Sequence, residues 1–170
     1  MEQTYFVTSE TAQRTMVFQS DRAADLFMDV LLGYRRQQKY LLHEFVLMPD
    51  RFHGLITPAP EVSLERAVHF IKGGFSFRLK SSVAVWQARF TNHGVRDRED
   101  FERYCEFIWA SPVRSGLASK REDYLFSSAG GRYELDPAPE RLTSHSGLAG
   151  QIPAQEAAEE LLSSPQLPRG

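Results

Sequence analysis

The sequence predicts an α/β (α+β) ferredoxin-like sandwich, in which helices pack on an antiparallel sheet. Two kinds of pattern support this prediction: short apolar segments with the alternation of strands, and longer segments with apolar residues at helical spacing. Their order is strand, helix, strand, strand, helix, strand, followed by a further helix, which is typical of this fold. A length of 170 residues, with 42% hydrophobic and 25% charged residues, suits one soluble domain with a full core.

The first three elements can be located from local patterns. A strand is expected at residues 4–8, where β-branched and aromatic residues are concentrated. A helix is expected at 22–38, because apolar residues recur there at intervals of three and four. The next helix is expected at 64–79, and its Gly73 and Gly74 indicate the close approach of another backbone or of a ligand.

The later elements are a strand region and a third helix. The strand region spans 85–97, and the helix begins at Asp97 to Asp100 and runs to about Ala110. Ser111 and Pro112 are expected to end it, since proline cannot continue a helix without losing a hydrogen bond.

A folded domain is expected at residues 1–133 and a tail at 134–170. The tail is rich in Pro, Ala, Ser and Glu, so it is expected to be largely disordered, with a short helix possible at 154–162. The whole chain has a net charge of −2, but 6 of its 22 acidic residues and only 2 of its 20 basic residues lie in the tail. The domain itself is therefore slightly basic, and the charge of the whole chain is a poor guide to its partners.

The chain also predicts a cellular setting. It contains no apolar run of about 18 residues and no signal-like start. Cys105 has no partner for an internal disulfide and is expected to be a buried thiol. We therefore expect a cytoplasmic protein with no membrane partner and no small-molecule cofactor.

The most informative segment is Met-Pro-Asp-Arg-Phe-His at residues 48–53. It joins an apolar strand at 41–47 to a second strand that ends at Thr57-Pro58, and its Pro-Asp pair indicates a tight turn. Residues two apart in a strand share a face. The segment therefore predicts one face with Arg51, His53 and Leu55, and another with Phe52, Gly54 and Ile56.

This segment resembles the HUH transposases with a single tyrosine, most closely the REP-associated tyrosine transposases, in which it reads Met-Pro-(Asn/Asp)-His-hydrophobic-His. The resemblance covers about residues 4–130 and extends to the segments at 71–76, 85–97 and 124–128. It implies the same fold, a hairpin or single-stranded DNA partner at the nucleoid, and a Mg²⁺ or Mn²⁺ cofactor. It also implies strand cleavage and rejoining through a covalent phosphotyrosine.

Three positions of the implied active centre are replaced. The resemblance places the metal-binding histidines at Arg51 and His53, the nucleophilic tyrosine at Phe107, and a further metal ligand, an asparagine, at Ser111. Arginine stays charged and cannot bind a cation, phenylalanine has no hydroxyl, and serine is a shorter and weaker ligand. We therefore expect metal binding to be compromised and cleavage to be impaired, with DNA binding retained.

Two alternatives remain open at this point. Tyr104 lies three residues before Phe107 and is a possible substitute nucleophile in a working transposase, although it is displaced by about one helical turn of 5 Å. A repurposed domain that binds a protein partner and no DNA is the second alternative. The candidate DNA contacts are basic residues that could equally be solvated surface groups: Arg51, Arg66, Lys72, Arg78, Lys80, Arg96 and Arg114.

Overall fold

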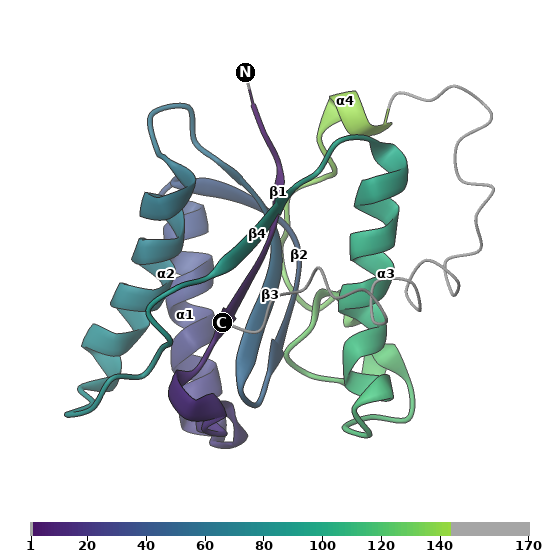
Figure 1. Cartoon of the computed structure of the whole chain (residues 1–170). Helices are drawn as coiled ribbons and strands as arrows, with labels where there is room; N and C mark the ends of the chain where they lie inside the picture. Colours follow the sequence, from purple (N-terminus) through teal and green to yellow (C-terminus); the bar gives the residue numbers. More distant parts are fainter. Residues whose placement is uncertain (1, 144–170) are drawn as a thin grey trace.

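A computed structural model describes residues 2–143 and contains one four-stranded sheet (Figure 1). Its strands are β1 (Tyr5–Glu10), β2 (Tyr40–Met48), β3 (Arg51–Pro58) and β4 (Thr91–Gly94). They pair in the order β2-β3-β1-β4, and every pairing is antiparallel. This order, with the helical crossovers, is that of a ferredoxin-like sandwich, so the predicted fold class is confirmed.

The helices cover both faces of the sheet. Helices α1 (Asp21–Arg36) and α2 (Leu64–Leu79) pack on one face, whereas α3 (Arg98–Arg114) packs on the other (Figure 1). A last short helix, α4 (Glu140–Thr143), lies beside the start of α3. Short 3₁₀ turns occur at Ala12–Arg14, Val17–Gln19, Arg121–Asp123 and Ser128–Gly130.

Alternation along the strands divides the core into two layers. On the side of α1 and α2, Phe52 and Ile56 pack with the helices, and the ring of Phe52 lies 5.2 Å from that of Phe27. On the side of α3, Leu55 packs in a separate cluster with Phe107. The predicted division of the β3 residues between the two faces is therefore confirmed, and it places residue 53 beneath α3.

Helix α3 continues four residues beyond the predicted end at Ala110. Pro112 lies in its last turn, where the loss of one N–H donor affects only a single helical hydrogen bond. The turn is closed from beyond the proline, since the backbone N–H groups of Ser115 and Leu117 donate to the carbonyls of Ser111 and Pro112 at 3.1 and 2.8 Å. The prediction that Pro112 ends the helix was wrong for this reason.

The chain also stays packed beyond residue 133. The Asp136 carboxylate accepts hydrogen bonds from Arg35 at 2.9 and 3.1 Å and from the backbone N–H of Leu42 at 2.8 Å, and Leu142 is buried. The predicted start of the tail at Glu134 was based on composition alone. Composition carries no information about a contact with β2, nearly a hundred residues earlier in the chain. The predicted helix at 154–162 lies outside the described residues.

Gly74 lies where α2 packs tightly against α1. A Cβ atom at this position would lie 3.0 Å from side-chain atoms of both Val30 and Tyr34. Of the two explanations that the glycine pair allowed, the structure therefore supports contact with another helix. Among residues 2–143, no helix is both long enough and apolar enough to cross a membrane.

Candidate functional site

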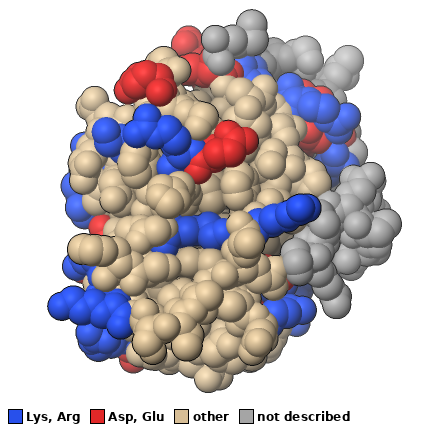
Figure 2. Space-filling view, turned by 60° about the vertical axis from the view of Figure 1, so that its left-hand side comes forward, with Lys and Arg blue, Asp and Glu red and all other residues tan. Residues whose placement is uncertain are grey.

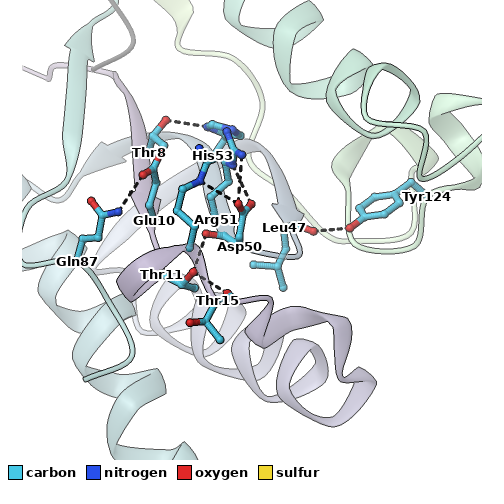
Figure 3. Close-up of polar contacts among 11 residues, drawn as sticks. Thr8, Glu10, Thr11, Thr15, Leu47, Asp50, Arg51, His53, Gln87 and Tyr124 are labelled. Atoms are coloured by element: carbon cyan, nitrogen blue, oxygen red, sulfur yellow. Dashed lines mark hydrogen bonds and ion pairs between the residues drawn. The ribbon is translucent and has the colours of Figure 1, made fainter. Parts of the chain in front are cut away.

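His53 is the centre of the site, and β3 presents it to α3. The residue is 4% exposed, and its ring lies against two phenylalanines, stacked on Phe6 at 5.7 Å and edge-on to Phe107 at 5.3 Å between ring centroids. Its Nδ1 is hydrogen bonded to the hydroxyl of Thr8 on the neighbouring strand at 2.7 Å (Figure 3). The ring orientation is therefore fixed from three sides.

The surroundings of His53 keep it neutral. Burial, reinforced by the positive charge of Arg51, lowers its pKa to about 3. A neutral imidazole that is hydrogen bonded through Nδ1 is the form that binds metals in other proteins. His53 alone therefore still meets the requirements of a metal ligand.

Arg51 does not meet those requirements, and its charge is held in place by the turn before it. Its Nε and Nη2 atoms donate to the two carboxylate oxygens of Asp50 at 3.0 and 3.3 Å, and Arg14 donates to the same carboxylate at 3.2 Å (Figure 3). Burial acts to raise the pKa of Asp50, but the two arginines outweigh it and the net shift is downward. The position that the resemblance assigns to a metal ligand thus holds a fixed guanidinium, whose side chain is 30% exposed.

The two remaining positions lie on α3. Phe107 is buried, and its ring also makes an edge contact with Phe6 at 5.7 Å. Ser111 is buried one turn further on, and its hydroxyl donates to the backbone carbonyl of Phe107 at 2.7 Å. Neither side chain offers an attacking oxygen, because the first has none and the second is bonded within its own helix.

These residues do not fit the divalent metal that the resemblance implied. A guanidinium beside His53 repels a cation, and Phe107 contributes no ligand atom. Within the described part of the chain, no group of three or more His, Cys, Asp or Glu side chains is arranged to hold a metal ion.

Tyr104 lies in a different part of the same helix face. Its ring stacks on Phe6 at 4.5 Å and approaches the ring of His93 at 6.2 Å. Burial and the nearby Asp100 carboxylate raise the pKa of its phenol. The reactive phenolate therefore forms less readily than in a free tyrosine, and an imidazole that lies near the ring is that of His93.

Several residues around the site were not predicted. Thr8 and Phe6 come from β1, and only the strand register brings them beside His53, 45 residues later in the case of Thr8. On β4, the hydroxyl of Thr91 and Nε2 of His93 are buried and have no hydrogen-bond partner within the described residues. The alternation along the first strand indicated which of its residues share a face of the sheet. No local pattern indicated which strands it pairs with or in what register.

The segment at 124–128 has a structural role. The hydroxyl of Tyr124 donates to the carbonyl of Leu47 at 2.7 Å, and Ser127 forms a bridge with Val46. The Ser128 hydroxyl is bonded to the carboxylate of Glu44 at 2.7 Å. This segment fastens the chain after α3 to β2, and it thereby holds α3 over the sheet.

The predicted DNA contacts do not form a single cluster. The strand directions place Arg51, the end of α2 and the end of α3 at the lower end of the molecule in Figure 1, and the starts of both helices at the upper end. The lower group contains Arg51, Arg78, Lys80 and Arg114. The upper group contains Arg66 and Arg96.

Besides Arg51, which keeps Nη1 free of Asp50, three of these basic groups are already engaged within the protein. The Lys72 ammonium donates to the carbonyl of Gln87 at 2.8 Å, and burial lowers its pKa. Arg96 binds both carboxylate oxygens of Asp100 at 2.8 and 3.0 Å. Arg66 lies over the ring of Phe70 at 5.4 Å. The cations at the lower end are therefore the better candidates for a partner that reaches the site.

The four-stranded antiparallel sheet with helices on both faces is the fold that the resemblance to HUH transposases implied. A family model described as "Transposase IS200 like" matches residues 2–98, more than half of the chain, and the chain belongs to this family. It is similar to the REP-associated tyrosine transposase of Escherichia coli (strain K12), with 25% identity over 114 residues that cover 62% of this chain and 67% of that protein.

A solved structure, that of a REP-associated tyrosine transposase bound to a REP hairpin, is also similar. It matches with a TM-score of 0.67 at 22% identity, over 85% of this chain and 89% of that one, which shows a shared fold. The family model ends at Arg98, where α3 begins. It therefore includes Arg51 and His53 but not Phe107 and Ser111, whose assigned roles remain predictions.

Proposed function

We propose that this chain binds hairpin or single-stranded DNA through an IS200-like transposase scaffold and does not cleave it. One observation carries the proposal: Arg51 and Phe107, which can provide neither a metal ligand nor a nucleophile, both adjoin His53 in an otherwise intact fold. Transfer of a strand to a tyrosine requires an attacking hydroxyl and stabilisation of charge on the phosphate oxygens. Phe107 has no hydroxyl, so the first requirement is not met at that position.

Arg51 can meet the second requirement in a different way. Asp50 engages only its Nε and Nη2 atoms, which leaves the two N–H bonds of Nη1 for another acceptor. Guanidinium groups bind phosphate oxygens well, and a phosphate bound here would lie where a metal would otherwise hold it. The proposed role of Arg51 is therefore to bind a DNA phosphate, which is not cleaved because Phe107 supplies no attacking hydroxyl.

The partner is inferred from two supports. A protein of the same fold has been solved with a REP hairpin, although that likeness alone transfers only the fold. The end of the molecule that carries Arg51 also carries the ends of α2 and α3, where Lys80 and Arg114 occur in the chain, and phosphate contacts by such residues dominate the affinity of DNA-binding proteins.

The proposal can be tested with a labelled DNA hairpin that has a single-stranded extension. We expect a fluorescence-anisotropy titration to give the same affinity in EDTA and in Mn²⁺, and denaturing gels to contain no covalent protein–DNA adduct. Arg51→Met should weaken binding about tenfold or more, because a charged hydrogen bond contributes about 1.5–3 kcal/mol. Arg36→Met, which removes an exposed arginine at the far end of α1, is the matched control and should leave the affinity unchanged.

Each alternative has its own result in the same experiment. A metal-dependent adduct that disappears in Tyr104→Phe would mean that Tyr104 attacks the DNA, despite its contacts with Phe6 and His93. The absence of binding even at low salt would mean that the fold now serves another partner. Either result would overturn the proposal.

A further inference from the structure

Phe77 is the only aromatic side chain among residues 2–143 that is largely exposed to solvent. It lies in the last turn of α2 and is 82% exposed, and Val83 in the loop that follows is 73% exposed. The other phenylalanines of this helix, Phe70 and Phe75, are partly or fully buried. No described side chain covers the Phe77 ring. Packing in the core therefore does not explain why this position holds an aromatic residue.

The chain around Phe77 carries only positive charge. No Asp or Glu occurs between Glu65 and Asp97, and this stretch contains Arg66, Lys72, Arg78, Lys80, Arg89 and Arg96. Figure 2 brings the α2 side of the molecule forward; blue side chains occur in both its upper and lower parts, whereas most red ones lie in its upper part. A surface of this kind attracts negatively charged partners, and a polyanion above all.

Three basic residues near Phe77 in the sequence, Arg78, Lys80 and Arg89, form weak ion pairs or none within the described part of the chain. Arg78 reaches Asp29 only at 3.9 Å, and both side chains are well exposed, so this pair is weak. Within the described part of the chain, neither Lys80 nor Arg89 forms a salt bridge, and both are exposed. These cations can therefore bind phosphates without first losing a partner.

A hydrogen-bonded connection links this region to Arg51. The Trp86 indole donates to the carbonyl of Lys72 at 3.0 Å, and the backbone N–H of Gln87 donates to the carbonyl of Glu10 at 2.9 Å. The Gln87 amide also donates to the Glu10 carboxylate at 3.1 Å, and Glu10 is the register partner of Arg51 (Figure 3). The loop after Phe77 is thus fixed to the end of β1, beside Arg51.

From these observations we propose that Phe77 stacks against a base of single-stranded DNA, while Lys80 and Arg89 bind the phosphates beside it. This inference rests on the proposed DNA-binding function and names the part of the DNA that this surface recognises, the unpaired segment next to a hairpin. Every base has a flat face, so stacking on an aromatic ring tolerates many sequences. A basic surface, formed by a segment that has no acidic residue between Glu65 and Asp97, favours this occupant over a protein partner.

The test compares two labelled probes, a blunt hairpin and the same hairpin with a single-stranded extension. Phe77→Ala should weaken binding of the extended hairpin about 5- to 150-fold, the range expected for the loss of one stacked base, and leave the blunt hairpin unaffected. Phe77→Trp should retain the affinity, whereas Phe77→Leu, which keeps an apolar side chain, should lose it. Leu125→Ala, which trims an exposed apolar side chain elsewhere, is the matched control.

A second readout separates the ring from the charges. Lys80→Ala and Arg89→Ala should each reduce the slope of log affinity against log salt by about one for the extended probe, and Phe77→Ala should not change that slope. A 2-aminopurine in the extension should be quenched on binding to the unmodified chain and to Phe77→Trp, but not to Phe77→Ala.

The outcomes distinguish this inference from the proposed function. If the unmodified chain binds neither probe, the proposed function fails, and the inference fails with it. If the unmodified chain binds both probes and Phe77→Ala binds them equally well, DNA binding stands and the role of Phe77 is refuted. Equal weakening of both probes by Phe77→Ala would also refute it, because the contact would then not be with the unpaired segment.

Discussion

Acidification from pH 7 to pH 5 is expected to destabilise the folded chain through His53. Burial and the Arg51 charge lower the folded-state pKa of His53 to about 3, whereas an unfolded histidine has a pKa of about 6.5. Between these values the unfolded state binds a proton that the folded state rejects. The stabilisation is therefore complete above about pH 6.5 and is lost progressively as the pH falls toward 3, and the loss between pH 7 and pH 5 is about 2 kcal/mol.

The assay is urea unfolding at pH 7 and pH 5, with the unmodified chain and with His53→Gln. Other groups also titrate, including His43, whose pKa burial lowers, but their contribution is common to both chains. The difference between the two pH-dependent losses therefore reports on residue 53. The substitution itself lowers the free energy of unfolding at pH 7, and this effect cancels in the comparison.

Two results would refute this reasoning. Equal losses of stability in the two chains would mean that residue 53 exchanges no proton on unfolding in this pH range. A histidine ring signal in NMR spectra that titrates near pH 6.5, and that is absent from His53→Gln, would mean that the ring is more hydrated than its contacts with Phe6 and Phe107 imply.

Three further predictions concern catalysis and stability. The triple variant Arg51→His, Phe107→Tyr, Ser111→Asn is expected to gain Mn²⁺-dependent nicking of hairpin DNA, measured on denaturing gels. If it folds, as judged by circular dichroism, and stays inactive, the losses extend beyond these positions. Asp100→Asn should lower the free energy of unfolding by about 1–3 kcal/mol, because this buried carboxylate binds two arginines; an unchanged urea midpoint would contradict that account. Gly54→Ala should cost about 1–3 kcal/mol by the same measurement, since its Cβ would lie 2.6 Å from a ring atom of Phe52, which is held in the core; a neutral result would mean that this ring can move.

Local patterns predicted most of the elements, because their signals lie within one or two turns of chain. The second helix was predicted at 64–79 and is observed at Leu64–Leu79, where apolar spacing and a serine cap at Ser63 agree. The Pro49-Asp50 turn and the alternation of the β3 residues were predicted for the same reason. The resemblance to the transposase family was confirmed by the family model that matches residues 2–98.

Other features could not be obtained from neighbours in sequence. Residues 134–142 are held by the pairing of Asp136 with Arg35 and Leu42, which composition does not reveal. Lys72 resembled a surface cation on a basic helix, but the fold directs its ammonium group to Gln87. In each case the deciding contact joins segments whose relative position is set by packing of the whole domain.

The sequence by itself determined the chemical character of the candidate site. It specified a guanidinium at residue 51, a ring without a hydroxyl at 107 and an imidazole at 53, and no fold can change the atoms that these side chains contribute. Only the tertiary structure decided that the ring of Phe107 meets His53, that Asp50 holds Arg51, and that Phe77 is left in solvent. The physical reason is that side-chain chemistry is local, whereas contact and exposure depend on the register of the strands and on how α2 and α3 pack against them.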